Sequence, residues 1–366
     1  MDYTLIKGFN KKIMEEIITN IHIHTRYSDG KKLHHEIAED AINACLDAII
    51  ITDHNIYVKG FDGYYARGNQ KVLVIVGEEI HDKNRVPQKN HMLVMGNNKS
   101  HARYAKSPQE LIDSVNAVGG LTFIAHAYDP ELAVFGEDDL SWEDWSISDY
   151  TGLELWNNLS EFKIRVNNFL QAAFYAFFPA YLAKEPPSQI RKIWDLLLAE
   201  GKKVVAIGGT DAHTLVYHFG PFSKTVFPYS YHFKTINTHI LVENRLTGDA
   251  KMDSKQILAA LKKGNAFIAN DSVKSARGFR FYATVNEKSY PMGEAVPFKD
   301  NMILTAEIPA NADFILLKNG NPVLNKQKCQ FITYNVETPG WYRIECYRNY
   351  LLERRGWIFS NPIYIQ

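Results

Sequence analysis

Cysteine is scarce in this chain of 366 residues. The three cysteines, Cys45, Cys329 and Cys346, lie far apart in the sequence, which argues against a disulfide framework and against a zinc knuckle built from thiolates. Proteins that depend on disulfides belong to oxidising compartments, so we expect this chain to work in a reducing one.

Long apolar runs are also missing. The longest, AAFYAFFPAYLA at 172–183, contains Pro179 and is too short to span a bilayer. The segment MDYTLIKGFNKKIMEE at the start has neither the apolar core nor the small-residue cleavage site of a secretory signal. We therefore predict a cytoplasmic protein with no membrane partner.

The chain has no net charge, because 41 Lys and Arg residues balance 41 Asp and Glu residues. This balance argues against an extended surface for nucleic acid, although a local basic pocket stays compatible with it. Hydrophobic residues make up 46% of the chain, which is enough for a substantial core. We expect a small-molecule substrate as the partner and leave a homo-oligomer open.

Residues 16 to about 270 alternate short β-branched runs with segments of helical periodicity. Ser107, Pro108 and Glu110 predict a helix that begins with an N-cap and a proline in its first turn. Runs that are apolar on both faces and separated by helices predict a parallel sheet, and their number favours a barrel. The predicted strands cover residues 17–24, 48–54, 71–80, 91–96, 121–127, 152–157, 203–213 and 238–244.

The pattern changes near residue 276. Beyond it, short alternating runs such as FRFYATV, MILTAEI and WYRIECY are separated by turn sequences such as KNGNP and TPGW. We therefore predict an α/β domain at 1–275, with a helical insert at about 129–202, followed by a small all-β sandwich domain at 276–366.

Histidine and acidic residues gather at the ends of the predicted strands. In a parallel barrel the carboxyl ends of all strands face one side, so these residues would converge on one rim. Residues i and i+2 of a strand point the same way, so the two residues of each His-x-His or Asp-x-His pair should aim together. The residues are His22, His24, His54, His91, His126 and His213, together with Asp29, Asp211 and either Glu78 or Glu79.

A single histidine at a strand end is commonly a hydrogen-bonded structural residue. Nine uncompensated polar groups buried in one place would be costly, however, and divalent cations would satisfy them. Imidazole and carboxylate ligands without thiolate suit Zn, Mn or Fe. The pattern predicts a centre of two or three divalent cations.

Five motifs in series, HIHTRYSDG, ITDHN, GEEI…HMLVMG, IAHA and GGTDAH, resemble those of the PHP (polymerase and histidinol phosphatase) family, in the family's order. The resemblance covers roughly residues 16 to 270. It implies a distorted (β/α)7 barrel with a trinuclear metal centre and phosphoesterase activity.

The resemblance also implies which residues hold each cation. The first would take His22, His24, a bridging Glu79 and Asp211. The second would share Glu79 and add His91 and His126, and the third would take Asp29, His54 and His213. Glu79 is preferred to Glu78 because the family's glutamate directly precedes the apolar residue.

A water shared by two cations becomes hydroxide near neutral pH and would attack the phosphoester, while the cations neutralise charge on its oxygens. Asp53 is expected to orient a ligand. Arg26 and Lys31 are candidate phosphate contacts, although exposed surface charges are equally plausible. His81 is either an extra ligand or substrate contact, or a residue just outside the ligand shell.

Two other functions stay open at this point. A PHP barrel followed by a sandwich that ends in GWIFSNPIYI is similar to the carbaryl-hydrolase-like branch of the family, which implies cleavage of a carboxylic or carbamate ester at the same centre. A non-catalytic accessory module is the third interpretation, and the full set of predicted ligands argues against it.

Overall fold

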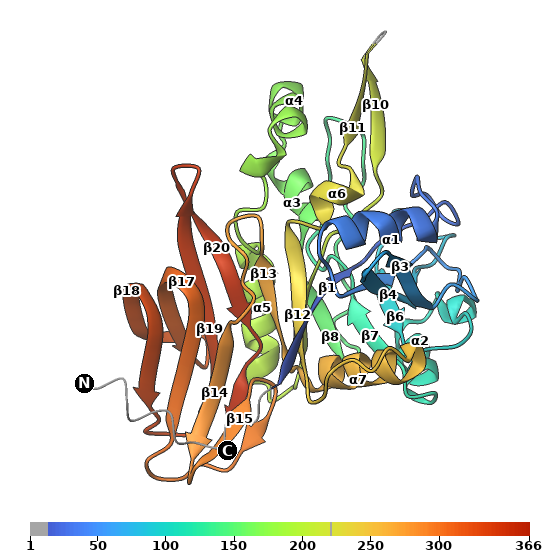
Figure 1. Ribbon diagram of the computed structural model, residues 1–366. Helices are drawn as coiled ribbons and strands as arrows, with labels where there is room; N and C mark the ends of the chain where they lie inside the picture. Colours follow the sequence, from blue (N-terminus) through green and yellow to red (C-terminus); the bar gives the residue numbers. More distant parts are fainter. Residues whose placement is uncertain (1–13, 220–221) are drawn as a thin grey trace.

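The computed structural model describes residues 14–219 and 222–366 (Figure 1). The first 13 residues of the predicted α/β domain, which include most of the segment MDYTLIKGFNKKIMEE, lie outside the described residues. Within the described part, an α/β region is followed by a region of strands alone, so the predicted order of a mixed and an all-β part is confirmed.

Two large sheets form the core of the α/β region, and both are rich in buried Val, Ile and Leu. One contains β1 (Glu15–Ile21), β2 (Ala48–Ile51), β3 (Gly63–Arg67), β4 (Gln70–Val76), β12 (Ile236–Val242) and β13 (Ala266–Asn270). The other contains β5 (Glu78–Ile80), β6 (Met92–Met95), β7 (Leu121–Ile124), β8 (Gly152–Asn157) and β9 (Val205–Gly209).

The prediction of a parallel sheet is wrong in part, because both sheets are mixed. The pairs β1–β2, β2–β4, β7–β8 and β8–β9 are parallel. The pairs β1–β12, β3–β4, β5–β6 and β6–β7 are antiparallel. Apolar runs report burial on both faces of a strand but not the direction of its neighbour, which explains the error.

The two sheets are connected at the carboxyl ends of β1 and β2. An isolated parallel bridge joins Ile23 to Ala212, and the His24 amide donates to the Ala212 carbonyl at 3.0 Å. A second bridge joins His54 to Glu79, where the Glu79 amide donates to the Asp53 carbonyl at 3.1 Å. Segments that are far apart in sequence therefore meet just beyond the strand ends.

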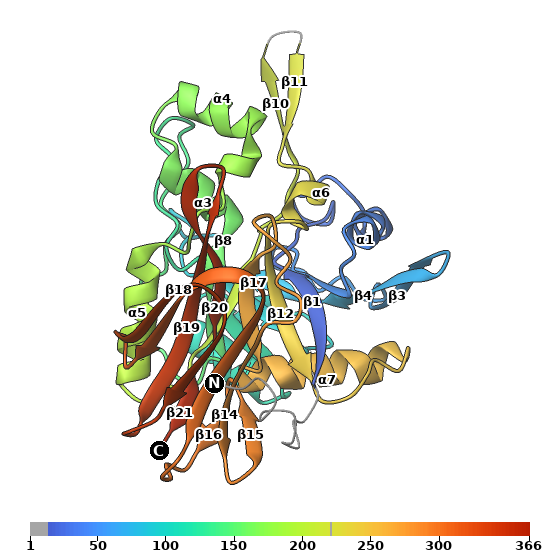
Figure 2. The ribbon, with the colours of Figure 1, turned by 60° about the vertical axis from the view of Figure 1, so that its left-hand side comes forward.

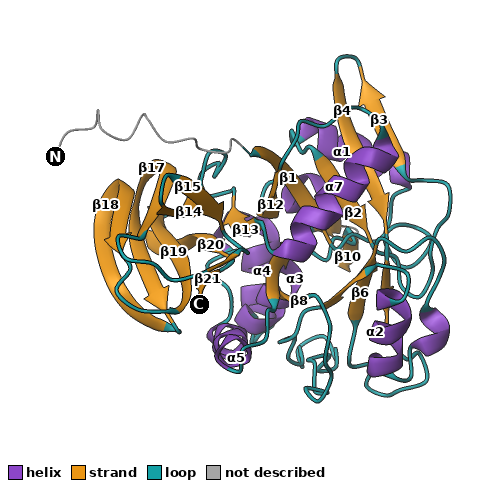
Figure 3. Ribbon diagram, turned by 90° about the horizontal axis from the view of Figure 1, so that it is seen from below, coloured by secondary structure: helices purple, strands orange, loops and turns teal. Residues whose placement is uncertain are grey.

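Three helices cover the outer faces of these sheets, as Figure 3 shows from below: α1 (His34–Asn43), α2 (Pro108–Asn116) and α7 (Ala250–Lys263). The predicted start of α2 is confirmed, because the Ser107 hydroxyl accepts from the Glu110 amide and Pro108 occupies the first turn. Asp249 caps the start of α7, and Gly264 ends it in the left-handed conformation that favours glycine. A short 3₁₀ turn, η1 (Ala102–Tyr104), precedes α2.

The predicted insert is not helical throughout, because β8 belongs to the second sheet. After it come α3 (Asn158–Arg165), α4 (Phe169–Phe177), the 3₁₀ turn η2 (Pro179–Tyr181) and α5 (Ser188–Ala199). A hairpin of β10 (Leu215–Phe219) and β11 (Phe222–Val226) then leads to α6 (Tyr229–His232). Helix α4 and the hairpin project from the same end of the molecule (Figures 1 and 2).

The C-terminal strands are antiparallel except for the parallel pair β16–β21. The long strand β17 pairs with β14 through its first half and with β19 through its second half. Their inner faces enclose a core that includes Phe281, Phe314, Tyr342 and Trp357. The strands are β14 (Arg280–Val285), β15 (Lys288–Pro291), β16 (Ala295–Val296), β17 (Ile303–Lys318), β18 (Asn321–Asn335), β19 (Gly340–Tyr350), β20 (Glu353–Ser360) and β21 (Ile363–Ile365).

The C-terminal strands do not form a separate sheet. Strand β20 pairs with β13, so the first sheet of the α/β region continues into them. A charge contact also joins the two parts: Arg280 on β14 contacts Glu16 at 2.6 Å, and Glu16 in turn contacts the buried His239, which lies 3.0 Å from Asp271 and 2.7 Å from Glu16. The boundary near residue 276 stays a prediction. No helix within residues 14–219 and 222–366 is both long and apolar enough to cross a membrane.

Candidate metal centre

The predicted ligands lie where the strands of the α/β region end. His22 and His24 follow β1, His54 follows β2, His126 follows β7, and Asp211 and His213 follow β9. Glu79 lies within β5, and His91 immediately precedes β6. Because β6 is antiparallel to its neighbours, the start of this strand lies beside the ends of the others.

Strand alternation does not explain why His22 and His24 converge. Strand β1 ends at Ile21, and His22 has a positive φ of 69°. Asp211, with a φ of 54°, and His126, with a φ of 25°, also adopt left-handed backbone conformations that non-glycine residues rarely occupy. Such strain persists only where the surrounding structure enforces it and is typical of functional sites.

The first ligand group combines His22, His24, Glu79 and Asp211, and all four residues are buried. The His22 Nε2 atom lies 3.0 Å from Glu79 Oε2 and 3.4 Å from Asp211 Oδ1, and the corresponding distances for His24 Nε2 are 3.2 and 3.1 Å. Despite this proximity, none of these four atoms has a hydrogen-bond partner among the described residues. Two imidazole nitrogens and two carboxylate oxygens without partners are the ligands that a divalent cation would take.

The second group contains Glu79, His91 and His126. Glu79 reaches it through its other oxygen: Oε1 lies 2.8 Å from His91 Nδ1 and 2.9 Å from His126 Nε2. The two oxygens of one carboxylate thus face two different groups of histidines. This is the arrangement that a bridging ligand requires.

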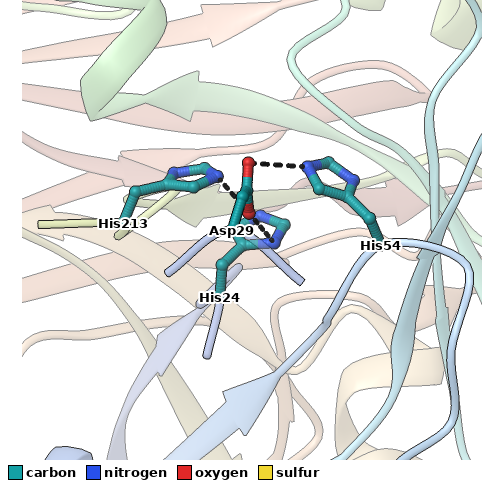
Figure 4. Close-up of side chains that lie close together, drawn as sticks. All are labelled: His24, Asp29, His54 and His213. Atoms are coloured by element: carbon teal, nitrogen blue, oxygen red, sulfur yellow. Dashed lines mark ion pairs between the residues drawn. The ribbon is translucent and has the colours of Figure 1, made fainter. Parts of the chain in front are cut away.

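The third group contains His24, Asp29, His54 and His213, which Figure 4 shows facing one another. Asp29 Oδ1 lies 3.2 Å from His213 Nε2, and Asp29 Oδ2 lies 3.6 Å from His54 Nε2. The His213 Nδ1 atom lies 2.8 Å from the Asp211 carbonyl and donates to it, so in the neutral ring Nε2 is the nitrogen that a cation would take. The Asp29 side chain is 54% exposed, so the centre opens to solvent on this side.

Glu79, and not Glu78, lies among the histidines. Glu78 points to the opposite side of β5, where its Oε2 atom accepts from the Asn97 amide and the His101 backbone at 3.0 Å each. Burial raises the pKa of Glu78. The geometry therefore favours Glu79 as the bridging carboxylate.

The charges of the cluster support one another. Burial by itself would raise the pKa of Glu79 and of Asp211, but the surrounding imidazoles hold both pKa values well below their usual range. Burial would likewise lower the pKa of the imidazoles, yet these carboxylates raise the pKa of His24 to about 10, and Glu79 raises that of His126 to about 9. Protons and cations would therefore compete for the same nitrogens.

Glu154, which the sequence motifs did not identify, is buried on β8 behind the first group. Both of its carboxylate oxygens lie 3.2 Å from His22 Nδ1, and Oε2 also accepts from the His126 backbone at 2.8 Å and from the Asn157 amide at 2.9 Å. A carboxylate at Nδ1 fixes the ring so that Nε2 faces the other ligands. The polar residue inside the apolar run GLELWN was the signal that could have identified it.

Gly209 on the neighbouring strand makes room for this carboxylate. A Cβ atom at that position would lie 2.0 Å from Glu154 Oε1 and 3.0 Å from the Ile21 carbonyl. Any side chain larger than hydrogen would therefore displace Glu154.

Two further residues hold the loop between His24 and Asp29. Asp53 accepts from the Thr25 backbone at 2.7 Å, from the Thr25 hydroxyl at 2.8 Å and from the Ser28 hydroxyl at 2.7 Å. Asp53 thus supports the ligands through the loop rather than by touching a ligand ring. Tyr229, which the sequence analysis also missed, donates its hydroxyl to the His24 carbonyl at 2.6 Å.

Of the three remaining residues predicted to contact ligands or substrate, two are exposed and one is buried beside the ligands. Arg26 does not turn into the centre, because its Nε atom donates to the Lys31 carbonyl at 2.7 Å on the exposed surface. Lys31 is exposed and donates its backbone amide to the Tyr229 hydroxyl. His81, by contrast, is buried beside His54 and His91.

Comparison with known proteins finds a family match over part of the chain. Residues 20–141 match the family model described as PHP domain. The matched segment is less than half of the chain and contains seven of the nine predicted ligands, whereas Asp211 and His213 lie beyond it. No curated protein matches the sequence.

Two solved structures are similar to parts or all of the chain. One is a two-domain protein from Bacteroides vulgatus that contains a predicted PHP-like metal-dependent phosphoesterase. Its sequence is 12% identical to this chain, the TM-score is 0.45, and the superposed residues cover 95% of this chain and 95% of the other. The other is a protein from Bifidobacterium adolescentis with a predicted assignment as a metal-dependent phosphoesterase. Its sequence is 18% identical to this chain, the TM-score is 0.33, and the superposed residues cover 53% of this chain and 87% of the other.

Proposed function

We propose that this chain is a metal-dependent phosphoesterase that hydrolyses a small phosphorylated or nucleotide substrate at a trinuclear centre. The observation that carries the proposal is the first ligand group, in which two imidazole nitrogens and two carboxylate oxygens converge without hydrogen-bond partners in the described part of the chain. The match of residues 20–141 to the PHP domain supports the same conclusion.

The residues have distinct parts in this proposal. Glu79 would bridge the first two positions, since its oxygens face different histidines. Asp29 would complete the third position at the exposed rim, where a substrate can arrive. Divalent cations at these positions would supply a hydroxide nucleophile near neutral pH and neutralise charge on the phosphoester oxygens.

We also propose that the ligands lie on a distorted (β/α)7 barrel of the PHP type, with the C-terminal strands as an accessory sandwich domain. A backbone contact of Ala212 supports the barrel. The Ala212 amide donates to the His22 carbonyl at 3.1 Å, so the segment after β9 lies against the segment after β1. The continuous path from β4 through Gly77 into β5 supplies the link between the two sheets.

An ester or carbamate hydrolase using the same cations, as in the carbaryl-hydrolase-like branch, is the second candidate. The two predicted phosphate contacts, Arg26 and Lys31, lie on the exposed surface, and Lys163 is paired with Asp129 at 2.7 Å. The surface position of Arg26 and Lys31 and the pairing of Lys163 favour a substrate of low charge over a highly charged one.

Metal analysis tests the first part of the proposal. Purified protein reconstituted with Zn²⁺, Mn²⁺ or Fe²⁺ and then freed of loosely bound ions should retain at least one equivalent of metal. His22→Ala and Asp211→Ala should both retain less, whereas His35→Ala, at an exposed histidine outside the ligand groups, should match the wild type. Retention of less than one equivalent by the wild type would contradict the metal centre.

A hydrolysis screen tests the second part. The substrates should include phosphomonoesters, phosphodiesters, bisphosphorylated nucleotides and aryl carbamates, each with the wild type and the three variants. Activity on phosphoesters that is lost in His22→Ala and Asp211→Ala supports the proposal. Activity on carbamates alone would replace it with the second candidate, and activity that survives in both variants would contradict the site.

A further inference from the structure

A fourth group of histidines lies beside the three predicted ligand groups. His54, His81 and His91 each offer a ring nitrogen, and these atoms lie within 4.8 Å of one another. The ring centre of His81 is 4.1 Å from that of His91 and 5.0 Å from that of His54. His81 follows Glu79 by two residues and belongs to none of the other groups.

Each ring of this group has at least one nitrogen without a good hydrogen-bond partner, although His91 Nδ1 lies 2.8 Å from Glu79 Oε1 and His54 Nδ1 lies 3.2 Å from Glu79 Oε2. His54 Nδ1 and His91 Nε2 are buried and have no hydrogen-bond partner among residues 14–219 and 222–366. The two ring nitrogens of His81 meet only the Asn55 amide, at 3.4 and 3.5 Å, which is too long for a well-formed hydrogen bond to either.

A structural histidine of the same chain looks different. His239 is fully buried, and its two nitrogens contact carboxylates at 2.7 and 3.0 Å. Buried polar groups are ordinarily satisfied in this way, so three neighbouring imidazoles that each leave a nitrogen without a well-formed hydrogen bond indicate a ligand.

We propose that His54, His81 and His91 form an additional cation position whose protein ligands are all imidazole. This inference rests on the proposed function, because two of its histidines also belong to the predicted centre. Three neutral imidazoles suit Zn²⁺, which is held at about 2.0–2.1 Å from ligating nitrogens, whereas Mn²⁺ prefers groups that include carboxylates.

The additional position competes with its neighbours. A neutral imidazole has one acceptor nitrogen, so His54 and His91 cannot serve this position and their other groups at the same time. His91 Nδ1 lies 2.8 Å from Glu79 Oε1, and a proton held there would leave Nε2, and not Nδ1, as the ligand for the additional position. We therefore expect the position to fill when Zn²⁺ is in excess.

Binding requires one ring to turn. The rings of His81 and His91 are nearly parallel, with an angle of 10° between their planes, so their in-plane lone pairs run side by side instead of converging. Glu79 holds His91, whereas His81 has only the weak contact with Asn55. The His81 ring should therefore rotate and lose its stacking on His91.

Crystals of the full chain soaked with excess Zn²⁺ provide the test, with anomalous difference maps collected at the zinc edge. We expect a peak bonded to a His81 nitrogen and to at least one of His54 and His91, together with an opened angle between the His81 and His91 rings. Peaks at the predicted groups with no peak at bonding distance from His81 would overturn the inference and leave the proposed function intact.

Zinc affinity in solution gives an independent measurement. Competition with a chromophoric chelator measures the affinity for the zinc ion that the protein binds most weakly. This affinity should be at least about tenfold lower in both His81→Ala and His81→Asn than in the wild type. His35→Ala is the matched control at an exposed histidine. Unchanged affinity in both His81 variants, with unfolding transitions like that of the wild type, would overturn the inference. Failure of the hydrolysis screen would instead remove the proposed function and leave the zinc measurement standing.

Discussion

Glu154 and His22 form a buried pair in which both carboxylate oxygens lie 3.2 Å from the Nδ1 atom of the ring. The opposite nitrogen, Nε2, then faces Glu79 and Asp211. A residue far along the chain therefore decides which nitrogen of His22 is offered to a cation. The same carboxylate accepts from the His126 backbone, so it supports two ligand groups at once.

Replacing this carboxylate by an amide should weaken metal binding. Glu154→Gln keeps the shape of the side chain but removes the charge that stabilises the Nδ1 proton of His22. We expect metal affinity to fall by about ten- to a hundredfold, as is usual for residues that orient metal-bound histidines. Chelator competition measures the change, and Glu131→Gln, at an exposed position, is the control. Equal affinities for the wild type and Glu154→Gln would show that the contact does not matter for binding.

Gly209→Ala should act through the same carboxylate. The added Cβ would lie 2.0 Å from Glu154 Oε1, so the free energy of unfolding should fall by about 1–3 kcal/mol, as in other overpacked cores. Urea unfolding of the metal-free protein measures this loss. In a Glu154→Ala background the clash is absent, and the cost of Gly209→Ala should shrink. A cost that is the same in both backgrounds would place the strain at the Ile21 carbonyl instead.

Metal affinity should rise with pH between about 6 and 9. The pKa of His24 is raised to about 10 and that of His126 to about 9, so both rings tend to be protonated at neutral pH when only the carboxylates neutralise them. A cation must displace these protons, and the affinity should change by about tenfold per pH unit for each proton released. Competition titrations at several pH values, together with proton-release measurements, check this. A flat profile would mean that the rings are neutral before the metal binds.

His239 should make the stability of the protein depend on pH in the opposite direction. Burial would lower its pKa, but Asp271 and Glu16 raise it to about 9, above the ordinary value of 6.5. The charged ring therefore contributes stability that is fully present below pH 6.5 and is lost as the pH rises towards 9. In urea unfolding of the metal-free protein, the wild type should lose more stability between pH 7 and 9.5 than His239→Gln does.

The His239→Gln variant also has an expected cost at pH 7. It leaves Glu16 and Asp271 buried with less compensating charge, so the free energy of unfolding should fall by about 3–5 kcal/mol. Because His239 lies outside the ligand groups, metal affinity should not change. A loss of metal affinity together with stability would show that this buried ion pair and the metal centre are coupled.

The sequence by itself was sufficient for the local features. Ser107 and Pro108 set the start of α2 through contacts within one turn, and the alternation of apolar runs identified most strands. The motifs also marked the nine predicted ligands, and the structure brings all of them into the three expected groups, with His24 as an additional member of the third. These features depend on neighbouring residues or on motifs, and both can be read along the chain.

Tertiary structure decided what depends on pairing between distant segments. The direction of β6, the joining of β13 to β20 and the contact of Glu154 with His22 follow from which strands lie side by side, and periodicity along one strand carries no record of its neighbours. The turn of Arg26 away from the centre and the position of His81 beside His54 and His91 are of the same kind. The left-handed backbone at His22 and Asp211 is likewise held by the bridge between Ile23 and Ala212. The amino-acid sequence thus determined which residues are available for metal chemistry, and packing determined how they are aimed, because orientation is set by contacts between segments that are remote in the chain.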